Sequence, residues 1–297
     1  MSRSGQVLAA VRRTAPLVHC LTATVSMELV ANLLLACGAR PTMTWTAREA
    51  PATAGIADAL LVNLGTLSEQ GRAGMAATVP VAVERGLPWV LDPAAIGPAP
   101  SRVDLARELL AQRPDVVRCN ASELLVLAGT GRGGRGADST ETPEQALRAA
   151  RRLAREHGCV VAVSGPVDHL TDGERVVRLA NGTAMLARVT GTGCALGALT
   201  AACCAAELAL GAQRGPGWAL DAAVAATSWL AVAGERADKR SRGPGSFRGA
   251  LLDEIFLLDE QALVREQRVE QQDVGQDVAP QVRGDATGSG WTIEEER

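Results

Sequence analysis

The sequence predicts a single α/β domain, with a mostly parallel central sheet flanked by helices and a helical cluster toward the C-terminus. Short apolar runs alternate with longer helical segments through most of the chain, which is typical of parallel strands joined by crossover helices. Hydrophobic residues make up 47% of the chain and aromatic residues only 2%, so Ala, Leu and Val must build the core. Such a core suits helices packed on both faces of a parallel sheet.

Buried strands are predicted at five short apolar runs. These runs are Leu17–Leu21, Ala59–Asn63, Pro88–Leu91, Asp115–Cys119 and Cys159–Ser164. Helices are expected between them, at Ser26–Cys37, Ser68–Arg85, Ser101–Gln112, Ala121–Ala128 and Pro143–His157. Ser26 and Ser68 are expected to be helix N-caps, and Pro143 suits a first helical turn.

The order of elements changes after Gly165. Asp168–Thr171 and Arg175–Leu179 flank an Asp-Gly turn, which predicts a β-hairpin. Three helices are expected to follow, at Cys194–Leu210, Ala219–Ala237 and Ser246–Leu258. We therefore expect one domain over residues 1–260. Residues 261–297 are polar and lack apolar periodicity, which predicts a disordered tail.

Composition excludes several classes of protein. A net charge of −3 gives no case for a nucleic-acid surface. The seven cysteines include no Cys-x-x-Cys pair and lie mostly in apolar runs, which favours reduced thiols and a cytoplasmic location. The three histidines share no ligand spacing with the cysteines, so no zinc site is predicted.

No membrane partner is expected either. The first 14 residues lack a charged head followed by an apolar core, so we expect no signal peptide. The apolar run Ala195–Leu210 contains Glu207 and begins at a glycine-rich turn. It is expected to be a buried helix rather than a membrane span.

Two glycine-rich segments suggest different roles. Gly131–Gly136 matches Gly-x-Gly-x-x-Gly, but a helix precedes it and more loop follows. A dinucleotide site requires a strand before the motif and a helix directly after it. This segment is therefore predicted to be a mobile surface loop. Thr190–Cys194 instead opens a long Ala/Leu helix, where free backbone N–H groups and the helix dipole attract anions. Gly191, Thr192 and Gly193 are thus candidates for a phosphate cradle.

Cys194 lies in that cradle. A helix N-terminus lowers the pKa of a thiol, so Cys194 is expected to be partly thiolate. It is a candidate base, or a group that orients a substrate hydroxyl, and the residues leave both roles open. Phosphoryl transfer depends mainly on positioning and charge stabilisation, so a weak base would suffice.

Charged residues follow two neighbouring predicted strands. Asp92 ends one strand, and Arg118 and Glu123 lie at the end of the next. Ligands bind at the carboxyl edge of such sheets. Asp92 and Glu123 are therefore candidates to hold Mg²⁺, and Arg118 is a candidate to neutralise phosphate oxygens.

The single lysine, Lys239, lies in Glu-Arg-Ala-Asp-Lys. This context excludes a Walker A loop and the strand lysine of protein kinases. A phosphate-handling enzyme with this sequence must rely on backbone amides, arginine and metal.

At these residues the sequence resembles hydroxyethylthiazole kinase, a ribokinase-like enzyme of thiamine salvage. The resemblance runs from about Leu17 to Leu258 and rests on the order and spacing of several short motifs. These are Val18–Thr22, Asn63–Leu67, Leu91–Pro93, Asn120–Glu123, Val167–Asp168 with Thr171–Gly173, Gly191–Cys194 and Gly243–Phe247.

The resemblance implies transfer of the γ-phosphoryl group of ATP to 4-methyl-5-(2-hydroxyethyl)thiazole, with Mg²⁺, in a homotrimer. It also implies a role for each matching site residue. Met43 and Gly191 would contact the thiazole, Arg118 and Ser164 would contact ATP, Asp92 and Glu123 would organise the metal, and Cys194 would lie beside the acceptor hydroxyl.

The chain departs from the family pattern at several positions. Ala23 replaces an asparagine after His-Cys-Leu-Thr, and Cys119 replaces a glycine beside the nucleotide. The alternatives are hydroxymethylpyrimidine kinase, which shares the Gly-Thr-Gly-Cys loop, a nucleotide-dependent dehydratase of hydrated nicotinamide cofactors, and a non-catalytic binding paralogue. The His-Cys-Leu-Thr and Asn120–Glu123 stretches favour the thiazole enzyme over the pyrimidine enzyme. Cys194 argues against the dehydratase, whose loop carries an aspartate.

Overall fold

The computed structural model describes residues 2–97, 99–130, 143–215 and 217–273. Within these ranges, nine strands form one sheet in the order β2-β1-β3-β4-β5-β6-β7-β8-β9. The strands are β1 (Leu17–Leu21), β2 (Arg40–Thr42), β3 (Ala59–Asn63), β4 (Trp89–Asp92), β5 (Val116–Asn120), β6 (Val160–Ser164), β7 (Asp168–Thr171), β8 (Arg175–Leu179) and β9 (Val269–Asp273). Pairing is parallel from β2 to β6 and antiparallel from β6 to β9.

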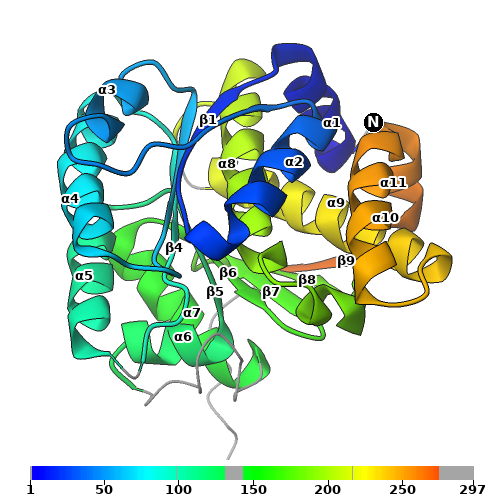
Figure 1. Ribbon diagram of the computed structural model, residues 1–297. Helices are drawn as coiled ribbons and strands as arrows, with labels where there is room; N and C mark the ends of the chain where they lie inside the picture. Colours follow the sequence, from blue (N-terminus) through cyan, green and yellow to red (C-terminus); the bar gives the residue numbers. More distant parts are fainter. Residues whose placement is uncertain (1, 98, 131–142, 216, 274–297) are drawn as a thin grey trace, which may run out of the picture.

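Helices cover both faces of the sheet (Figure 1). One face carries α3 (Ala50–Ala54), α4 (Glu69–Glu84), α5 (Pro100–Leu110), α6 (Ala121–Leu127) and α7 (Pro143–His157). The other carries α1 (Arg3–Thr14), α2 (Met27–Cys37), α8 (Thr192–Ala209), α9 (Trp218–Arg240), α10 (Pro244–Leu257) and α11 (Glu260–Glu266). Two 3-10 turns, η1 (Thr24–Ser26) and η2 (Ala184–Arg188), lead into α2 and α8. The predicted α/β architecture with its C-terminal helical cluster is confirmed.

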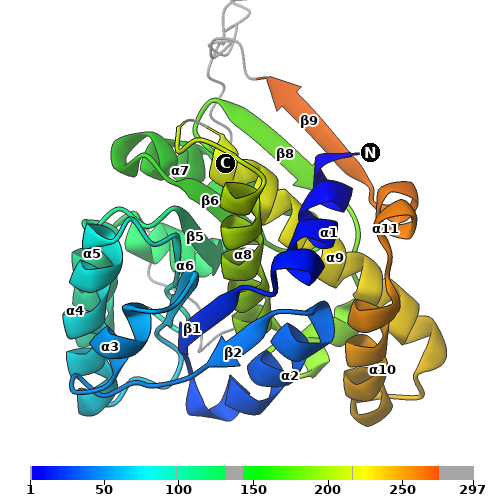
Figure 2. The same ribbon diagram turned by 90° about the horizontal axis from the view of Figure 1, so that it is seen from above.

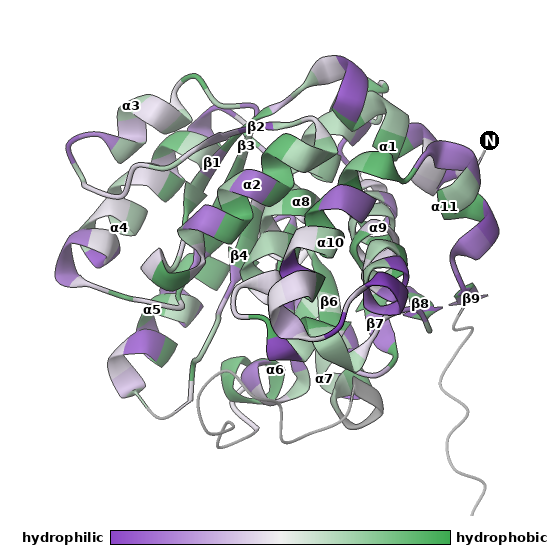
Figure 3. Cartoon of the chain, turned by 45° about the vertical axis from the view of Figure 1, so that its right-hand side comes forward, coloured by the Kyte–Doolittle hydropathy of each residue, from purple (hydrophilic) through white to green (hydrophobic). Residues whose placement is uncertain are grey.

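A separate apolar core lies on each side of the sheet, because each strand presents alternate residues to opposite faces. The α8-side core is built largely from Ala, Leu and Val, as the composition predicted. In the view from above, α8 crosses the middle of the sheet (Figure 2). Hydropathy colours show apolar residues along α8 and polar residues on outward turns of α4 and α5 (Figure 3).

Among the described residues, α8 alone is long and apolar enough to span a membrane. It packs between the sheet and α1, α2 and α9, and most of its residues are buried. It is therefore the buried core helix that the sequence predicted.

The hairpin and the five parallel strands lie where the sequence placed them, within one residue at each end. Ser68 caps α4 by accepting a hydrogen bond from the Gly71 N–H at 3.0 Å. Ser26, also expected to be a cap, makes no such bond for α2 and instead donates to the Ala23 carbonyl at 2.9 Å.

Besides the two 3-10 turns and the C-terminal elements α11 and β9, three elements were not predicted: α1, β2 and α3. In α1, Val7, Leu8 and Val11 are fully buried against α8 and α9, and Ser2 caps the helix. β2 has only three residues, and α3 has five with a proline near its start. Such short elements lack a readable period, and contacts with the rest of the fold decide their conformation.

The prediction that a disordered tail begins at residue 261 was wrong, because the ordered chain continues beyond it. The domain continues through α11 and β9, so ordered structure reaches Asp273. Glu266 of α11 receives two hydrogen bonds from Arg236 of α9, at 2.8 and 2.6 Å, and β9 pairs along β8. Backbone pairing with an edge strand does not require apolar side chains, which is why the polar sequence gave no strand signal. Residues 274–297, and the predicted Gly131–Gly136 loop, lie outside the described residues.

Candidate active site

Polar side chains line the carboxyl edge of four neighbouring parallel strands. Asn63 of β3 is in register with Asp92 of β4, and Arg118 of β5 follows on the next strand. Ser164 of β6 lies two residues farther along, in register with Asn120. Because side chains alternate between faces, these four lie on the same face as Leu61, which belongs to the α8-side core. They therefore meet the N-terminal end of α8.

Glycines allow the start of α8 to approach that row closely. Gly191 precedes the helix with a φ of 94°, and a Cβ there would lie 2.8 Å from the Cβ of Ser26. A Cβ on Gly193 would lie 2.7 Å from Nη1 of Arg118. The first-turn N–H groups of a helix have no partner within it, so they are available to an anion beside Arg118.

The Thr192 hydroxyl points away from the candidate cradle. It donates to the carbonyl of Leu186 at 2.7 Å and to that of Val189 at 3.3 Å. These bonds turn the side chain back toward η2 and fix the entry into α8. Only the Thr192 backbone N–H remains for a ligand.

Asp92 is fully buried, and neither of its carboxylate oxygens accepts a hydrogen bond of normal geometry. Burial raises its pKa, while the charge of Arg118 and the nearby Asn63 amide oppose that shift. Nη1 of Arg118 lies 3.7 Å from Asp92 Oδ2, and Nη2 donates to Ser164 Oγ at 3.0 Å. Buried oxygens without partners indicate a place for a ligand or ion.

Glu123 borders the same region from the first turn of α6. It forms a capping box with Asn120, whose backbone N–H donates to Glu123 Oε2 at 2.9 Å. Oε1 accepts from the Ala95 N–H at 2.8 Å. Burial and the neighbouring Asp92 raise the pKa of Glu123 to about 7. Each carboxylate oxygen thus retains a lone pair while the side chain ties two loops together.

Cys194 is on the first turn of α8 and is the one cysteine of the seven that is not fully buried. Its sulfur accepts a hydrogen bond from Asn63 Nδ2 at 3.4 Å. The expected fall in its pKa was wrong, because burial and the charge of Asp92 raise the pKa above its ordinary value. The neighbouring Ser26 side chain, the charge of Arg118 and the hydrogen bond from Asn63 only partly oppose this.

Met43 directly follows β2, at the same edge of the sheet but beyond β1. It is partly buried against the α8-side core. Two strands, β1 and β3, separate β2 from the β4 strand that ends at Asp92. The structure thus gathers Asp92, Arg118 and Cys194 at the centre, with Met43 farther out.

Two residues of the site had no role assigned from sequence: Asn63 and Ser26. Asn63 ends a strand beside Asp92, so the signal that singled out Asp92 applies to it equally. Ser26 packs against Gly191 and was read only as a helix cap. Only the fold brings it beside α8.

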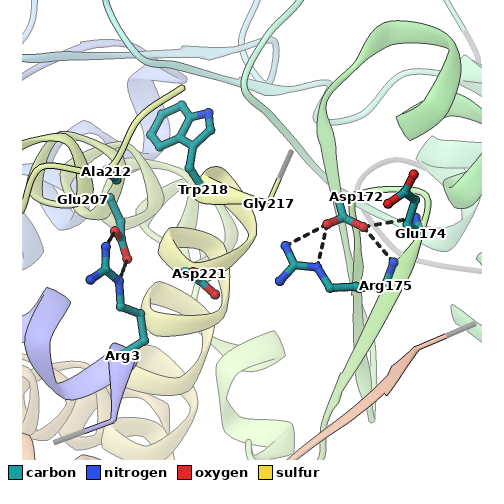
Figure 4. A pocket seen from close by; sticks show the side chains of 9 residues that line it. All are labelled: Arg3, Asp172, Glu174, Arg175, Glu207, Ala212, Gly217, Trp218 and Asp221. Carbon is teal, nitrogen blue, oxygen red and sulfur yellow. Dashed lines mark hydrogen bonds and ion pairs between the residues drawn. The ribbon is translucent and has the colours of Figure 1, made fainter. Parts of the chain in front are cut away.

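A separate pocket of about 410 Å³ lies at the other end of α8 (Figure 4). Glu207, which lines it, is 13 residues beyond Cys194, or about 20 Å along the helix. Its charges largely pair with one another, Arg3 with Glu207 and Arg175 with Asp172. None of the residues in the strand-end row lines this pocket, so it is distinct from the candidate site.

Comparison with known proteins matches this arrangement to one family. The sequence model of the hydroxyethylthiazole kinase family matches residues 8–261. A hydroxyethylthiazole kinase from Cronobacter sakazakii is 51% identical over 255 residues, which cover 86% of this chain and 92% of that protein. One from Cereibacter sphaeroides is 46% identical over 270 residues, covering 91% and 99%.

A comparison with solved structures supports the same family. A hydroxyethylthiazole kinase from Pyrococcus horikoshii superposes with a TM-score of 0.81 at 34% identity, covering 92% of this chain and all of that one. Pyridoxal kinase from Bacillus subtilis, at 19% identity and a TM-score of 0.52, covers 74% of this chain and 91% of that one. It shares the fold alone.

Proposed function

Because the chain belongs to the hydroxyethylthiazole kinase family, we propose that it transfers the γ-phosphoryl group of ATP to the hydroxyl of 4-methyl-5-(2-hydroxyethyl)thiazole. The observation that carries the proposal is the meeting of Arg118, Asp92 and Cys194 at the amide end of α8. A cation, an unsatisfied carboxylate and free N–H groups are the components that phosphoryl transfer requires.

Each component has a distinct task. The N–H groups of Thr192 and Gly193 would bind oxygens of the migrating phosphoryl group, and Arg118 would offset their charge. Ser164, which already accepts from Arg118, would border the nucleotide. Met43 and Gly191 would face the thiazole on the side of Ser26.

Cys194 would orient the alcohol rather than deprotonate it. A thiol whose pKa is raised stays protonated at neutral pH, so few molecules would carry a thiolate base. The sulfur can still accept a hydrogen bond from the substrate hydroxyl and so turn an oxygen lone pair toward phosphorus.

The residues at the site fit a magnesium ion. Asp92 offers two buried oxygens without partners, and Glu123 offers its remaining lone pairs, all of them the hard oxygen ligands that Mg²⁺ prefers. When bound, the ion would neutralise charge on the phosphate chain. No group of three or more His, Cys, Asp or Glu side chains gathers within the described ranges, so the triphosphate and water would complete the coordination.

We also propose a homotrimer in the cytoplasm. Val25, Leu35 and Phe256 are large apolar side chains exposed on η1, α2 and α10, and α2 packs against α10. Exposed apolar side chains of this size suit contact with another copy of the chain. The seven free cysteines suit a reducing compartment. Light scattering from the full chain tests the oligomer.

The activity is tested by ATP consumption with a panel of small heteroaromatic alcohols. We expect turnover with hydroxyethylthiazole, magnesium dependence and a thiazole phosphate product. Preferential turnover of hydroxymethylpyrimidine would favour the pyrimidine enzyme instead. Absence of turnover with every alcohol, in a folded protein supplied with ATP and Mg²⁺, would support the non-catalytic alternative.

A further inference from the structure

Asn63 links two parts of the candidate site. It is the last residue of β3 and is 1% exposed. Its Oδ1 accepts from the backbone N–H of Gly65 at 3.0 Å, and its Nδ2 donates to Cys194 Sγ at 3.4 Å. Residue 63 therefore joins the turn after β3 to the first turn of α8.

The first bond fixes the direction of the second. Only the oxygen of a carboxamide accepts a hydrogen bond, so the Gly65 N–H determines that the NH₂ group faces the sulfur. The turn leaves little room for movement, because a Cβ on Gly65 would lie 2.9 Å from Asn63 Oδ1 and 2.8 Å from the Cβ of Ala23. The Asn63 NH₂ group that donates to Cys194 is thus held in place through the backbone N–H of Gly65.

The other neighbour of the sulfur is Ser26. Its hydroxyl donates to the Ala23 carbonyl at 2.9 Å, so the hydrogen is directed away from the sulfur and the lone pairs of the oxygen are available to the thiol. The Cys194 S–H would then point to Ser26, while the sulfur accepts from Asn63 on one side. One sulfur lone pair remains, directed away from both.

We propose that Asn63 is a positioning residue that aims this remaining lone pair of Cys194 at the hydroxyl of the acceptor alcohol. The proposal rests on the proposed kinase function. No covalent bond to sulfur forms and no proton leaves it, so the step is one of orientation. Without the Asn63 donor, the thiol would populate other staggered rotamers about its Cα–Cβ bond and would hold the alcohol in the reactive direction less often.

A double-mutant cycle tests the link through sulfur. We expect Asn63→Ala to lower kcat about tenfold, while KM for ATP changes by less than about twofold. In a Cys194→Ala background, the same Asn63→Ala change is expected to lower kcat by less than about twofold. An equal loss in both backgrounds would overturn the proposal, since Asn63 would then act through the fold or through Asp92.

Asn63→Asp covers the case in which the alanine variant fails to fold. It keeps an oxygen for the Gly65 N–H but replaces the donor to sulfur with a carboxylate oxygen and adds a charge beside Asp92, so it should lower kcat at least as much. Asn181→Ala is the matched control. Asn181 is also buried and donates to Glu235 and to the Glu266 carbonyl, but it follows β8, five strands from β3.

Alkylation by iodoacetamide tests the contact without any turnover. Six of the seven cysteines are fully buried, so labelling of the folded chain should report Cys194, and Cys194→Ser serves as the blank. We expect both Asn63 variants to slow labelling at fixed pH severalfold, because the lost donor stabilises the thiolate, and Asn181→Ala to leave it unchanged. Unchanged labelling in the Asn63 variants would overturn the proposal, whereas absent turnover with altered labelling would refute only the kinase function.

Discussion

Nη1 of Arg118 lies 3.7 Å from Oδ2 of Asp92, at the ends of two neighbouring strands. Asp92 is fully buried, yet its oxygens have no hydrogen-bond partner, and Nε of Arg118 also lacks one. Native proteins rarely leave buried polar atoms unsatisfied. The pair is therefore arranged for a bound group that completes its interactions.

Replacing Asp92 should remove both activity and part of the stability. Asp92→Ala leaves the Arg118 cation buried without its counter-charge, and we expect a loss of a few kcal/mol in unfolding free energy. We also expect activity to fall by about 100-fold or more, with a weaker dependence on Mg²⁺. Urea unfolding and magnesium titrations of the rate measure the two effects. Asp92→Asn is the isosteric control. If Asp92→Ala kept the magnesium dependence of the wild type, Asp92 would not be a ligand of the metal.

Gly193 should tolerate no side chain. A Cβ there would lie 2.7 Å from Nη1 of Arg118, so Gly193→Val must displace the guanidinium or the helix end. We expect turnover to be abolished while the circular dichroism spectrum stays close to that of the wild type.

Gly249 provides the matched control, because it is also a helical glycine but nothing lies within 4 Å of the position of its Cβ. Gly249→Ala should keep full activity and raise stability by about 0.5–1 kcal/mol. Near-normal turnover of Gly193→Val would count against the phosphate cradle.

Cys194→Ser should keep part of the activity. A hydroxyl can accept from Asn63 and from the substrate as the thiol does, so an orienting role predicts a loss of about tenfold rather than total loss. Steady-state kinetics with the thiazole alcohol measure it. Complete loss in a variant that still binds ATP would instead indicate that the sulfur takes up the proton.

Asp168 should make stability depend on pH. Burial raises its pKa to about 6, although the Gly165 N–H and Arg118 oppose the shift. Its ordinary pKa is 3.8, so the folded state holds this proton more tightly than the unfolded state. The stability that this provides is fully present below about pH 4 and is lost as the pH rises through 6.

Asp168→Asn keeps an oxygen for the Gly165 N–H, which Oδ1 of Asp168 now accepts at 2.9 Å. We expect this variant to flatten the pH dependence of unfolding free energy between pH 4 and 6 by about 1–2 kcal/mol. Denaturant unfolding at several pH values measures the slope. A slope equal to that of the wild type would place the proton on another group.

The C-terminal elements should contribute to stability. Ending the chain after residue 258 removes the Arg236–Glu266 ion pair and the strand that covers β8. We expect the melting temperature to fall by several degrees, which corresponds to about 1–2 kcal/mol. A chain that ends after residue 273 keeps every described element and is the control. Equal melting temperatures in the two truncated chains would contradict the role of α11 and β9.

The sequence by itself determined the fold class, the parallel strands and the helix that carries Cys194. Short apolar runs such as Ala59–Val62 are typical of strands buried on both faces, and this property needs no knowledge of partners. The ends of such strands also indicated Asp92 and Arg118, because parallel strands place their carboxyl ends at one edge.

Only the tertiary structure decided the polar strand β9, the hydroxyl direction of Thr192 and the pKa of Cys194. β9 forms because β8 offers an unpaired edge, and the thiol pKa rises because surrounding atoms exclude water from the sulfur and the charge of Asp92 disfavours a thiolate. Hydrogen bonding and desolvation depend on residues distant in sequence, such as Asn63 and Cys194, 131 positions apart. A local sequence pattern does not indicate which distant residues lie close together in the fold.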